Sequence, residues 1–292
     1  MALKVLSGLD VSKQVYIQLI QKISFLRSKN VVPGLAVVLV GNNSASEIYV
    51  RSKTKKFKDL KLHSATIKVD SSVSEDKLIQ IIDELNNDQK YHGILVQLPL
   101  PDHIDKNNVI NSIDPKKDVD GFHPENAGLL SIGKPRFIPC TPKGIIRLLK
   151  FYNLSLNGQH VVVIGRSNLV GRPISILTSS SGEMLNATTT ICHSRTKDLP
   201  FYTKSADILI SAIGKSEFFT SKDIKKGAVL IDVGINKVNS NNTKGYKILG
   251  DFKWNSIKEL ASSATPVPGG IGPMTIAMLV ENTVLAAEIY SS

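Results

Sequence analysis

Short apolar runs alternate with amphipathic patterns along this chain, and this alternation limits the possible fold more than any other feature. Runs at residues 36–40, 66–69 and 93–98 have the length of strands, and patterns with helical spacing at 44–60 and 73–85 separate them. Strands that alternate with helices form βαβ units, in which the strands are parallel. The sequence therefore predicts a parallel α/β domain in the N-terminal part of the chain.

A second series of strand-sized runs follows a proline-rich stretch, residues 99–142, which we interpret as loop and as a domain boundary. Thr141 and Pro142 are typical of an N-cap and a first helical position, so a helix is expected to follow them. Beyond that helix come four further runs with strand character: 160–164, 188–192, 207–212 and 229–233.

At 292 residues the chain is long for a single hydrophobic core. We therefore predict the α/β class with two three-layer domains. The first spans residues 1–140 and is joined by the apolar C-terminal helix within 271–292, and the second spans 141–270 and is Rossmann-like.

Composition excludes several classes of protein. No apolar run approaches the roughly 20 residues of a membrane helix. The N-terminus lacks the basic and apolar regions of a secretion signal, so we expect a cytoplasmic protein. Cys140 and Cys192 are too few for a disulfide framework and lack metal-ligand spacing. We expect no metal site and interpret both cysteines as small buried apolar residues.

The net charge of +11 raises the question of an anionic partner. However, the cations are scattered, the densest cluster lies within residues 51–61, and few aromatic residues stand between them. We expect no nucleic-acid partner, and a compositional bias of the source genome is the simpler explanation of the charge.

A glycine-containing loop directly follows the run at 160–164. Residues 165–173 read GRSNLVGRP, and Pro173 suits the first turn of a helix. A strand, a loop and a helix N-terminus in this order place backbone N–H groups and a positive helix end toward a pyrophosphate. The spacing differs from G-x-G-x-x-G, so a plain tight turn is the alternative interpretation.

The next strand distinguishes between two nicotinamide cofactors. In an NAD-binding domain its end carries an acid for the adenosine ribose, whereas here the run at 188–192 ends in His193, Ser194 and Arg195. A hydroxyl group and nearby cations such as Arg166 bind a 2′-phosphate, which a carboxylate would repel. The sequence favours NADP, with ordinary polar loop residues as the alternative.

The N-terminal domain holds a set of residues suited to acid–base chemistry. Tyr49 and Lys53 are four residues apart and share a helical face, and Gln97 ends the third predicted strand. Such residues face the cleft where parallel sheets bind ligands. Asp118 and Asp120 lie in a loop that could reach this cleft, one of them with a structural role. An exposed lysine on a basic helix is the alternative for Lys53.

These residues belong to a larger pattern of six landmarks: residues 49–53, 93–101, 117–122, 165–173, 232–236 and 265–275. In this order the landmarks resemble those of the bifunctional methylenetetrahydrofolate dehydrogenase and methenyltetrahydrofolate cyclohydrolase family. They span nearly the whole chain.

The resemblance implies oxidation of methylenetetrahydrofolate with NADP and hydrolysis of the methenyl product to formyltetrahydrofolate in one-carbon metabolism. It implies a catalytic residue in Lys53, a stacking role for Tyr49, support of Lys53 by Gln97, and a pterin anchor in Asp120. It also implies an N-terminal catalytic domain, an NADP domain and a homodimer formed through the NADP domains.

We also expect one group of residues to contact the folate and another to contact the cofactor. The folate contacts expected beside these four residues are Leu98, Pro268, Gly269 and Gly270. The cofactor contacts expected are Gly165, Arg166, Ser167, Gly171, Arg172, Pro173, His193, Ser194 and Ile235.

Three other interpretations remain at this point. A dehydrogenase of another small substrate, such as an amino-acid or shikimate dehydrogenase, shares the two-domain plan but does not require the set around Lys53. A basic RNA-binding α/β protein would retain RNA in a salt-sensitive way. A fragment of a larger synthase would need a formate ligase domain, for which 292 residues leave no room.

Overall fold

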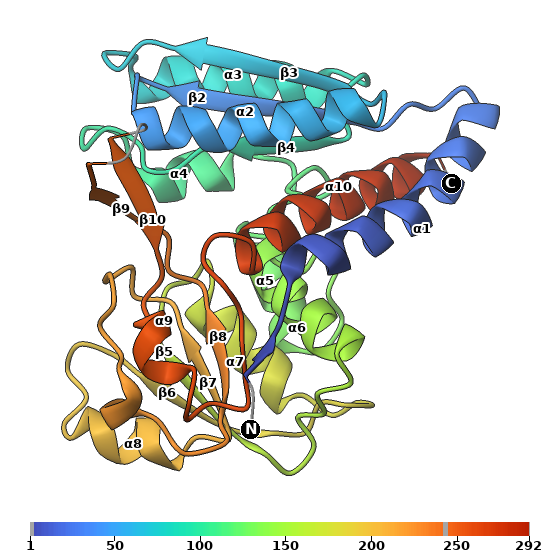
Figure 1. Ribbon diagram of the computed structural model, residues 1–292. Helices are drawn as coiled ribbons and strands as arrows, with labels where there is room; N and C mark the ends of the chain where they lie inside the picture. The colour runs from blue at the N-terminus through green and yellow to red at the C-terminus, as the bar shows by residue number, and fades with distance from the viewer. Residues whose placement is uncertain (1–2, 242–244, 292) are drawn as a thin grey trace. The chain divides into compact units, whose positions relative to one another are not determined.

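The computed structural model describes residues 3–241 and 245–291, without the side chains of residues 44 and 45. The chain divides into two compact units. One consists of Thr141–Thr275 and the chain up to Lys13, and the other of Gln14–Cys140 and the chain from Ile276 on. Two long helices, α1 (Gly8–Ser28) and α10 (Ile271–Tyr290), each contribute residues to both units (Figure 1).

The unit built on Gln14–Cys140 contains a three-stranded parallel sheet of order β3-β2-β4. The strands are β2 (Gly34–Val40), β3 (His63–Val69) and β4 (Gly93–Val96). The central strand β2 has a neighbour on each side and is buried along its whole length. The predicted βαβαβ unit is confirmed.

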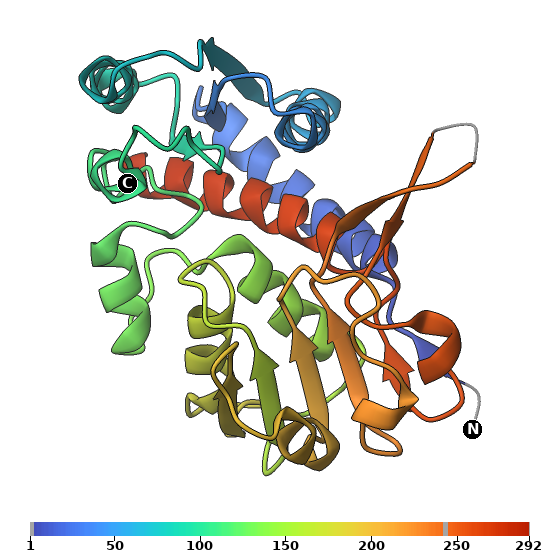
Figure 2. The same ribbon diagram turned by 90° about the vertical axis from the view of Figure 1, so that its left-hand side faces the viewer.

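Two helices connect these strands, α2 (Ser44–Asp59) and α3 (Glu75–Asn87). The chain moves from β2 outward to β3 and then back across β2 to β4. Right-handed crossovers in opposite directions place their helices on opposite faces of the sheet. Figure 2 shows α2 and α3 on either side of the strands. Side chains of α3 such as Ile82 pack with Val38 and Ile94 in the core of this unit.

The proline-rich stretch at 99–142 was predicted as loop, and this is wrong for part of it. It contains two short helices, α4 (Lys106–Asn111) and α5 (Pro124–Ser131). The Asp105 carboxylate caps α4 by accepting from the backbone N–H of Asn107 at 2.7 Å. Pro124 stands in the first turn of α5, where a missing N–H costs nothing. Proline here marks a helix start rather than a loop.

The other unit contains a six-stranded parallel sheet of order β1-β11-β8-β7-β5-β6. The strands are β1 (Lys4–Val5), β5 (His160–Ile164), β6 (Thr188–Cys192), β7 (Ile208–Ser211), β8 (Val229–Asp232) and β11 (Ser263–Ala264). Val162, Leu209 and Leu230 in its central strands are fully buried. The α/β class with parallel sheets is confirmed.

The helices of this unit are α6 (Cys140–Phe151), α7 (Gly171–Ser179), α8 (Leu199–Ser205), the 3-10 turn η1 (Ser221–Asp223) and α9 (Trp254–Ile257). Helix α6 begins at Cys140, so Thr141 lies inside it and is not the predicted N-cap. A hairpin of β9 (Asn236–Asn239) and β10 (Tyr246–Leu249) was not predicted.

The C-terminal helix α10 is anchored by a side chain in the unit that it completes. The Asn282 amide donates to the carbonyl oxygens of Val119 at 2.8 Å and Ile138 at 3.0 Å. Among the described residues, no helix has the length and apolar character needed to cross a membrane.

Candidate active site

Lys53 and Gln97 lie in contact, as the sequence predicted from the end of a strand and a helical face. Lys53 is on the third turn of α2, and Gln97 follows β4 directly. The Lys53 Nζ donates to Gln97 Oε1 at 3.0 Å, and the Gln97 Nε2 donates to the carbonyl oxygen of Leu98 at 2.8 Å. This chain of hydrogen bonds fixes the amide with its oxygen toward the lysine.

The Lys53 side chain is buried, with 8% of its surface exposed. Burial lowers the pKa of Lys53 below its ordinary value, and the negative charge of Asp120 opposes this effect. A lysine of this kind exchanges a proton closer to neutral pH than an exposed lysine does. The alternative interpretation of Lys53 as an exposed residue on a basic helix is therefore wrong.

Asp120 belongs to the same site. Burial raises the pKa of its carboxyl group, whereas the charge of Lys53 and a hydrogen bond from the Cys140 thiol lower it. The Cys140 Sγ also lies 3.7 Å from the Asn282 amide nitrogen. The sequence treated Cys140 as a small apolar residue. Its polar role was missed because a single cysteine next to a predicted helix start carries no recognisable signal.

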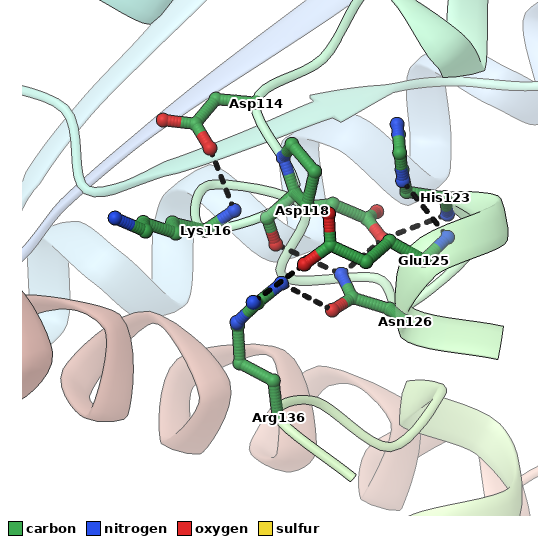
Figure 3. A network of polar contacts seen from close by, with 8 residues as sticks. Asp114, Lys116, Asp118, His123, Glu125, Asn126 and Arg136 are labelled. Atoms are coloured by element: carbon green, nitrogen blue, oxygen red, sulfur yellow. Dashed lines mark hydrogen bonds and ion pairs between the residues drawn. The ribbon is translucent and has the colours of Figure 1, made fainter. Parts of the chain in front are cut away.

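Asp118 has the structural role expected for one acid of the loop. It is buried, and its Oδ2 accepts from the His123 backbone N–H and the Asn126 amide, both at 2.8 Å. The Asn126 Oδ1 in turn accepts from Arg136 at 3.0 Å (Figure 3). These hydrogen bonds join Asp118 to His123 and Asn126 and so fix the conformation of the loop that carries Asp120.

Tyr49 precedes Lys53 by one helical turn on α2 and is half-buried. Burial raises the pKa of its phenol, so the ring carries its hydroxyl proton at neutral pH. Leu98 is also half-buried and follows Gln97 in the chain. Tyr49 therefore lies next to Lys53, and Leu98 lies next to Gln97.

The glycine loop occupies the switch point of the six-stranded sheet. From β5 the chain goes to β6 on one side and then returns to β7 on the other. The Gly165 N–H donates to the carbonyl oxygen of Cys192 at 2.9 Å, and a Cβ on Gly165 would stand 2.7 Å from the carbonyl oxygen of Ala212. Parallel sheets bind dinucleotides at this point.

Helix α7 starts directly behind this turn. A Cβ on Gly171 would overlap the carbonyl oxygen of Gly165, so only glycine allows the close approach. Ser167 Oγ accepts from the backbone N–H of Val170 at 3.1 Å, and Pro173 is buried in the first turn of the helix. The close-packed turn and the helix N-terminus fit a pyrophosphate group.

The polar residues expected to select NADP lie at the same edge of the sheet. Strand β6 pairs with β5 so that Cys192 stands opposite Ile164, and His193 and Ser194 follow directly. The His193 Nδ1 accepts from the Arg195 backbone N–H at 3.1 Å, which fixes the turn. Ser194 is exposed there, as is Arg166.

Arg172 and Ile235 are exposed in the same unit, Arg172 in the first turn of α7 and Ile235 after β8. The other predicted folate contacts, Pro268 to Gly270, also belong to this unit. Gly269 has φ +107°, and its carbonyl oxygen accepts from the Gly8 N–H at 2.9 Å. Glycine suits this backbone conformation.

The fold and the two sets of residues define an α/β enzyme with a nucleotide-binding sheet in one unit and a buried lysine site in the other. Family models agree with this division. The catalytic domain of tetrahydrofolate dehydrogenase/cyclohydrolase matches residues 6–120, and its NAD(P)-binding domain matches residues 139–291. The chain belongs to the tetrahydrofolate dehydrogenase/cyclohydrolase family.

Individual relatives cover nearly the whole chain. The bifunctional protein FolD of Chlorobium limicola is 52% identical over 88% of both chains. The crystal structure of the bifunctional enzyme FolD from Campylobacter jejuni is similar with a TM-score of 0.92 and 44% identity, covering 99% of this chain and 100% of that one. A Trypanosoma brucei enzyme, complexed with NADP and an inhibitor, has a TM-score of 0.94 and 33% identity, with 99% of each chain covered.

Proposed function

We infer that this protein oxidises 5,10-methylenetetrahydrofolate to 5,10-methenyltetrahydrofolate with NADP and hydrolyses the product to 10-formyltetrahydrofolate. The observation that carries this function is the buried Lys53, which donates a hydrogen bond to Gln97 and has a lowered pKa, in a chain of this family. The described residues of the other unit supply a close-packed glycine turn at a sheet switch point.

When bound, NADP would supply the acceptor for the hydride that leaves the methylene bridge. The residues that fit its pyrophosphate are the backbone N–H groups between Gly165 and Pro173, at the N-terminus of α7. Ser194 and Arg166 fit the 2′-phosphate, because both are exposed at the edge of the sheet and bear a hydroxyl group and a fixed positive charge.

Asp120 fits the aminopyrimidinone edge of the pterin, since a carboxylate accepts two adjacent N–H donors at once. For this it has to be ionised. The charged form of Lys53 and the hydrogen bond from the Cys140 thiol both favour ionisation against the effect of burial, and the Cys140 hydrogen bond remains when Lys53 is neutral. Tyr49 offers an aromatic face one helical turn away for stacking.

Hydrolysis of the methenyl cation needs a base. Water adds to the methenyl carbon, and the neutral amine of Lys53 takes the proton that the water loses. Protonated Lys53 returns this proton to N5, the bond between N5 and the carbon breaks as the new hydroxyl group loses its proton to solvent, and the formyl group remains on N10. Gln97 holds the amine through its Oε1 during this step. The lowered pKa of Lys53 makes the neutral amine available.

We assign catalysis to residues 1–140 with 271–292 and cofactor binding to 141–270. We also propose a homodimer formed through the cofactor-binding domains and a cytoplasmic location. The support for each is the resemblance to the family. Sedimentation equilibrium of the purified protein tests the dimer, for which twice the chain mass of 31.8 kDa is expected.

The dehydrogenase step is tested by initial rates with methylenetetrahydrofolate and either NADP or NAD, read from the absorbance of the reduced cofactor. We expect reduction with NADP and a much lower rate with NAD at equal concentration. Reduction with NAD alone would contradict the role of Ser194, and no reduction with either cofactor would contradict the proposed oxidation.

A further inference from the structure

Asp251 is fully buried just after β10 and holds the segment that leaves β7. Its Oδ1 accepts from the backbone N–H of Lys215 at 2.8 Å. Its Oδ2 accepts from the backbone N–H of Ile213 at 3.0 Å and from the Ser211 hydroxyl at 2.8 Å. One carboxylate thus fixes both ends of a short loop.

Asp232 at the end of β8 acts in the same way on the neighbouring loop, and it is 4% exposed. Its Oδ1 accepts from the backbone N–H groups of Gly234 and Asp251, both at 2.9 Å. Its Oδ2 accepts from the backbone N–H of Phe252 at 3.0 Å. The two aspartates are therefore linked to each other through a backbone hydrogen bond.

Two glycines make room for this pair. A Cβ on Gly234 would overlap the Asp251 carboxylate, and a Cβ on Gly250 would overlap the Asp232 carboxylate. The carboxyl groups fill the space that side chains would need, so each loop lies directly against one of them. Buried carboxylates that accept several N–H groups fix backbone strongly, because leaving such a charge without donors is costly.

Both loops adjoin residues of the predicted cofactor site. The loop that Asp251 holds begins at Ala212, whose carbonyl oxygen stands against the Gly165 turn. The loop that Asp232 holds continues into Ile235, a predicted cofactor contact. Neither aspartate was singled out by the sequence for this role.

We propose that Asp232 and Asp251 are positioning residues that hold the two loops in the conformation that binds the nicotinamide cofactor. This inference rests on the proposed function. The aspartates act through Gly234, Ile213 and Lys215 and not by contact with the reacting atoms. Removing one carboxylate is expected to weaken cofactor binding and to leave the Lys53 site intact.

The pH dependence of cofactor binding distinguishes this positioning role from a purely structural one. Burial raises the pKa of Asp232 to about 7, and the charge of Asp251 contributes to the rise. The polar partners of Asp232 among the described residues are backbone N–H groups, and Lys215 faces Asp251 with its backbone N–H. As the pH falls through 7, Asp232 gains a proton and loses acceptor capacity, so the affinity for the cofactor falls.

The test uses the full-length protein and measures the dissociation constant of NADP between pH 5.5 and 8.5, with NAD as a second probe that lacks the titrating 2′-phosphate. In Asp251→Asn we expect the affinity for NADP to drop about tenfold at pH 8, because the variant loses a charged hydrogen-bond acceptor. The pH midpoint for both cofactors should move down, because the neighbouring charge is gone. Asp232→Asn is the second variant, for which we expect a similar drop in affinity at pH 8 and no pH midpoint for NAD.

Asp207→Asn is the matched control. Asp207 directly precedes β7, whereas the loop that Asp251 holds follows the other end of this strand. It should bind NADP as the parent does. Folding is checked by thermal unfolding, and hydrolysis of methenyltetrahydrofolate without cofactor should stay within about twofold in every folded variant.

Folded Asp251→Asn and Asp232→Asn proteins that bind NADP with the parent's affinity would overturn the inference. A parent protein whose affinity for NAD is constant across pH 7 would also overturn it, even where neither variant folds. A parent that binds NADP but does not oxidise methylenetetrahydrofolate would contradict the proposed function alone.

Discussion

The Nζ of Lys53 lies 3.0 Å from the Oε1 of Gln97, a residue 44 positions further along the chain. The contact exists because α2 follows β2, and β4, which ends before Gln97, is the neighbour of β2 in the sheet. Parallel pairing brings the carboxyl ends of both strands to one edge. A buried amine that is held by an amide and not by a carboxylate keeps a lowered pKa.

Replacement of this lysine should remove hydrolysis. In Lys53→Met we expect the rate of methenyltetrahydrofolate hydrolysis to fall at least about a hundredfold, the usual size of a general-base contribution. The absorbance of the methenyl compound gives the rate directly. Lys55→Met is the control, because Lys55 is exposed on the same helix, and it should hydrolyse at the parent rate. Hydrolysis by Lys53→Met at that rate would refute the role of Lys53.

Asp120→Asn should change the pH dependence of hydrolysis. The negative charge of Asp120 favours the charged form of Lys53, so its removal lowers the pKa of Lys53 further. The neutral amine then forms at lower pH, and the acidic limb of the pH–rate profile should shift to lower pH. The KM for folate should rise about ten- to a hundredfold, as for loss of a charged acceptor. A limb that stays in place or shifts upward would contradict this coupling.

A carboxylate in place of Ser194 should reverse part of the cofactor preference. In Ser194→Asp the KM for NADP is expected to rise at least about tenfold, because the new charge repels the 2′-phosphate, whereas the KM for NAD should change little or fall. Ser194→Ala serves as the control and should lose less. Initial rates of cofactor reduction measure both constants, and equal effects on the two cofactors would speak against a 2′-phosphate site here.

Gly171→Ala should damage the cofactor turn and leave hydrolysis in place. The added methyl group would overlap the carbonyl oxygen of Gly165 and push the start of α7 away from the turn. We expect a loss of about 1–3 kcal/mol of stability and weaker NADP binding, from thermal unfolding and titration. Gly128→Ala on α5 is the control, since nothing stands within 4 Å of its added Cβ. An unchanged NADP affinity in Gly171→Ala would count against the turn as a binding site.

The regular parts of the fold follow from short-range patterns in the sequence. The bounds of β5 and β6 match the predicted runs 160–164 and 188–192, because both are apolar or β-branched runs with turn residues on each side. The Lys53–Gln97 contact could be predicted from strand ends and helical spacing. Helix α5 could not, since its proline and its glycine are typical of loops and the cap at His123 is evident only in the structure.

The polar interior of the site depends on contacts between distant residues. Nothing near Cys140 in the sequence indicates a hydrogen bond to Asp120, 20 residues away. The Asp232 and Asp251 pair likewise forms because the hairpin β9–β10 brings the second aspartate back to the end of β8. That hairpin alternates polar and apolar residues weakly, so it was not recognised.

The bifunctional activity is tested most directly by mixing the purified protein with methylenetetrahydrofolate and NADP and quenching samples in acid, which separates the methenyl from the formyl product. We expect formyltetrahydrofolate to appear together with the reduced cofactor and faster than uncatalysed hydrolysis allows. Accumulation of the methenyl compound, with formyl product forming only at the uncatalysed rate, would contradict it.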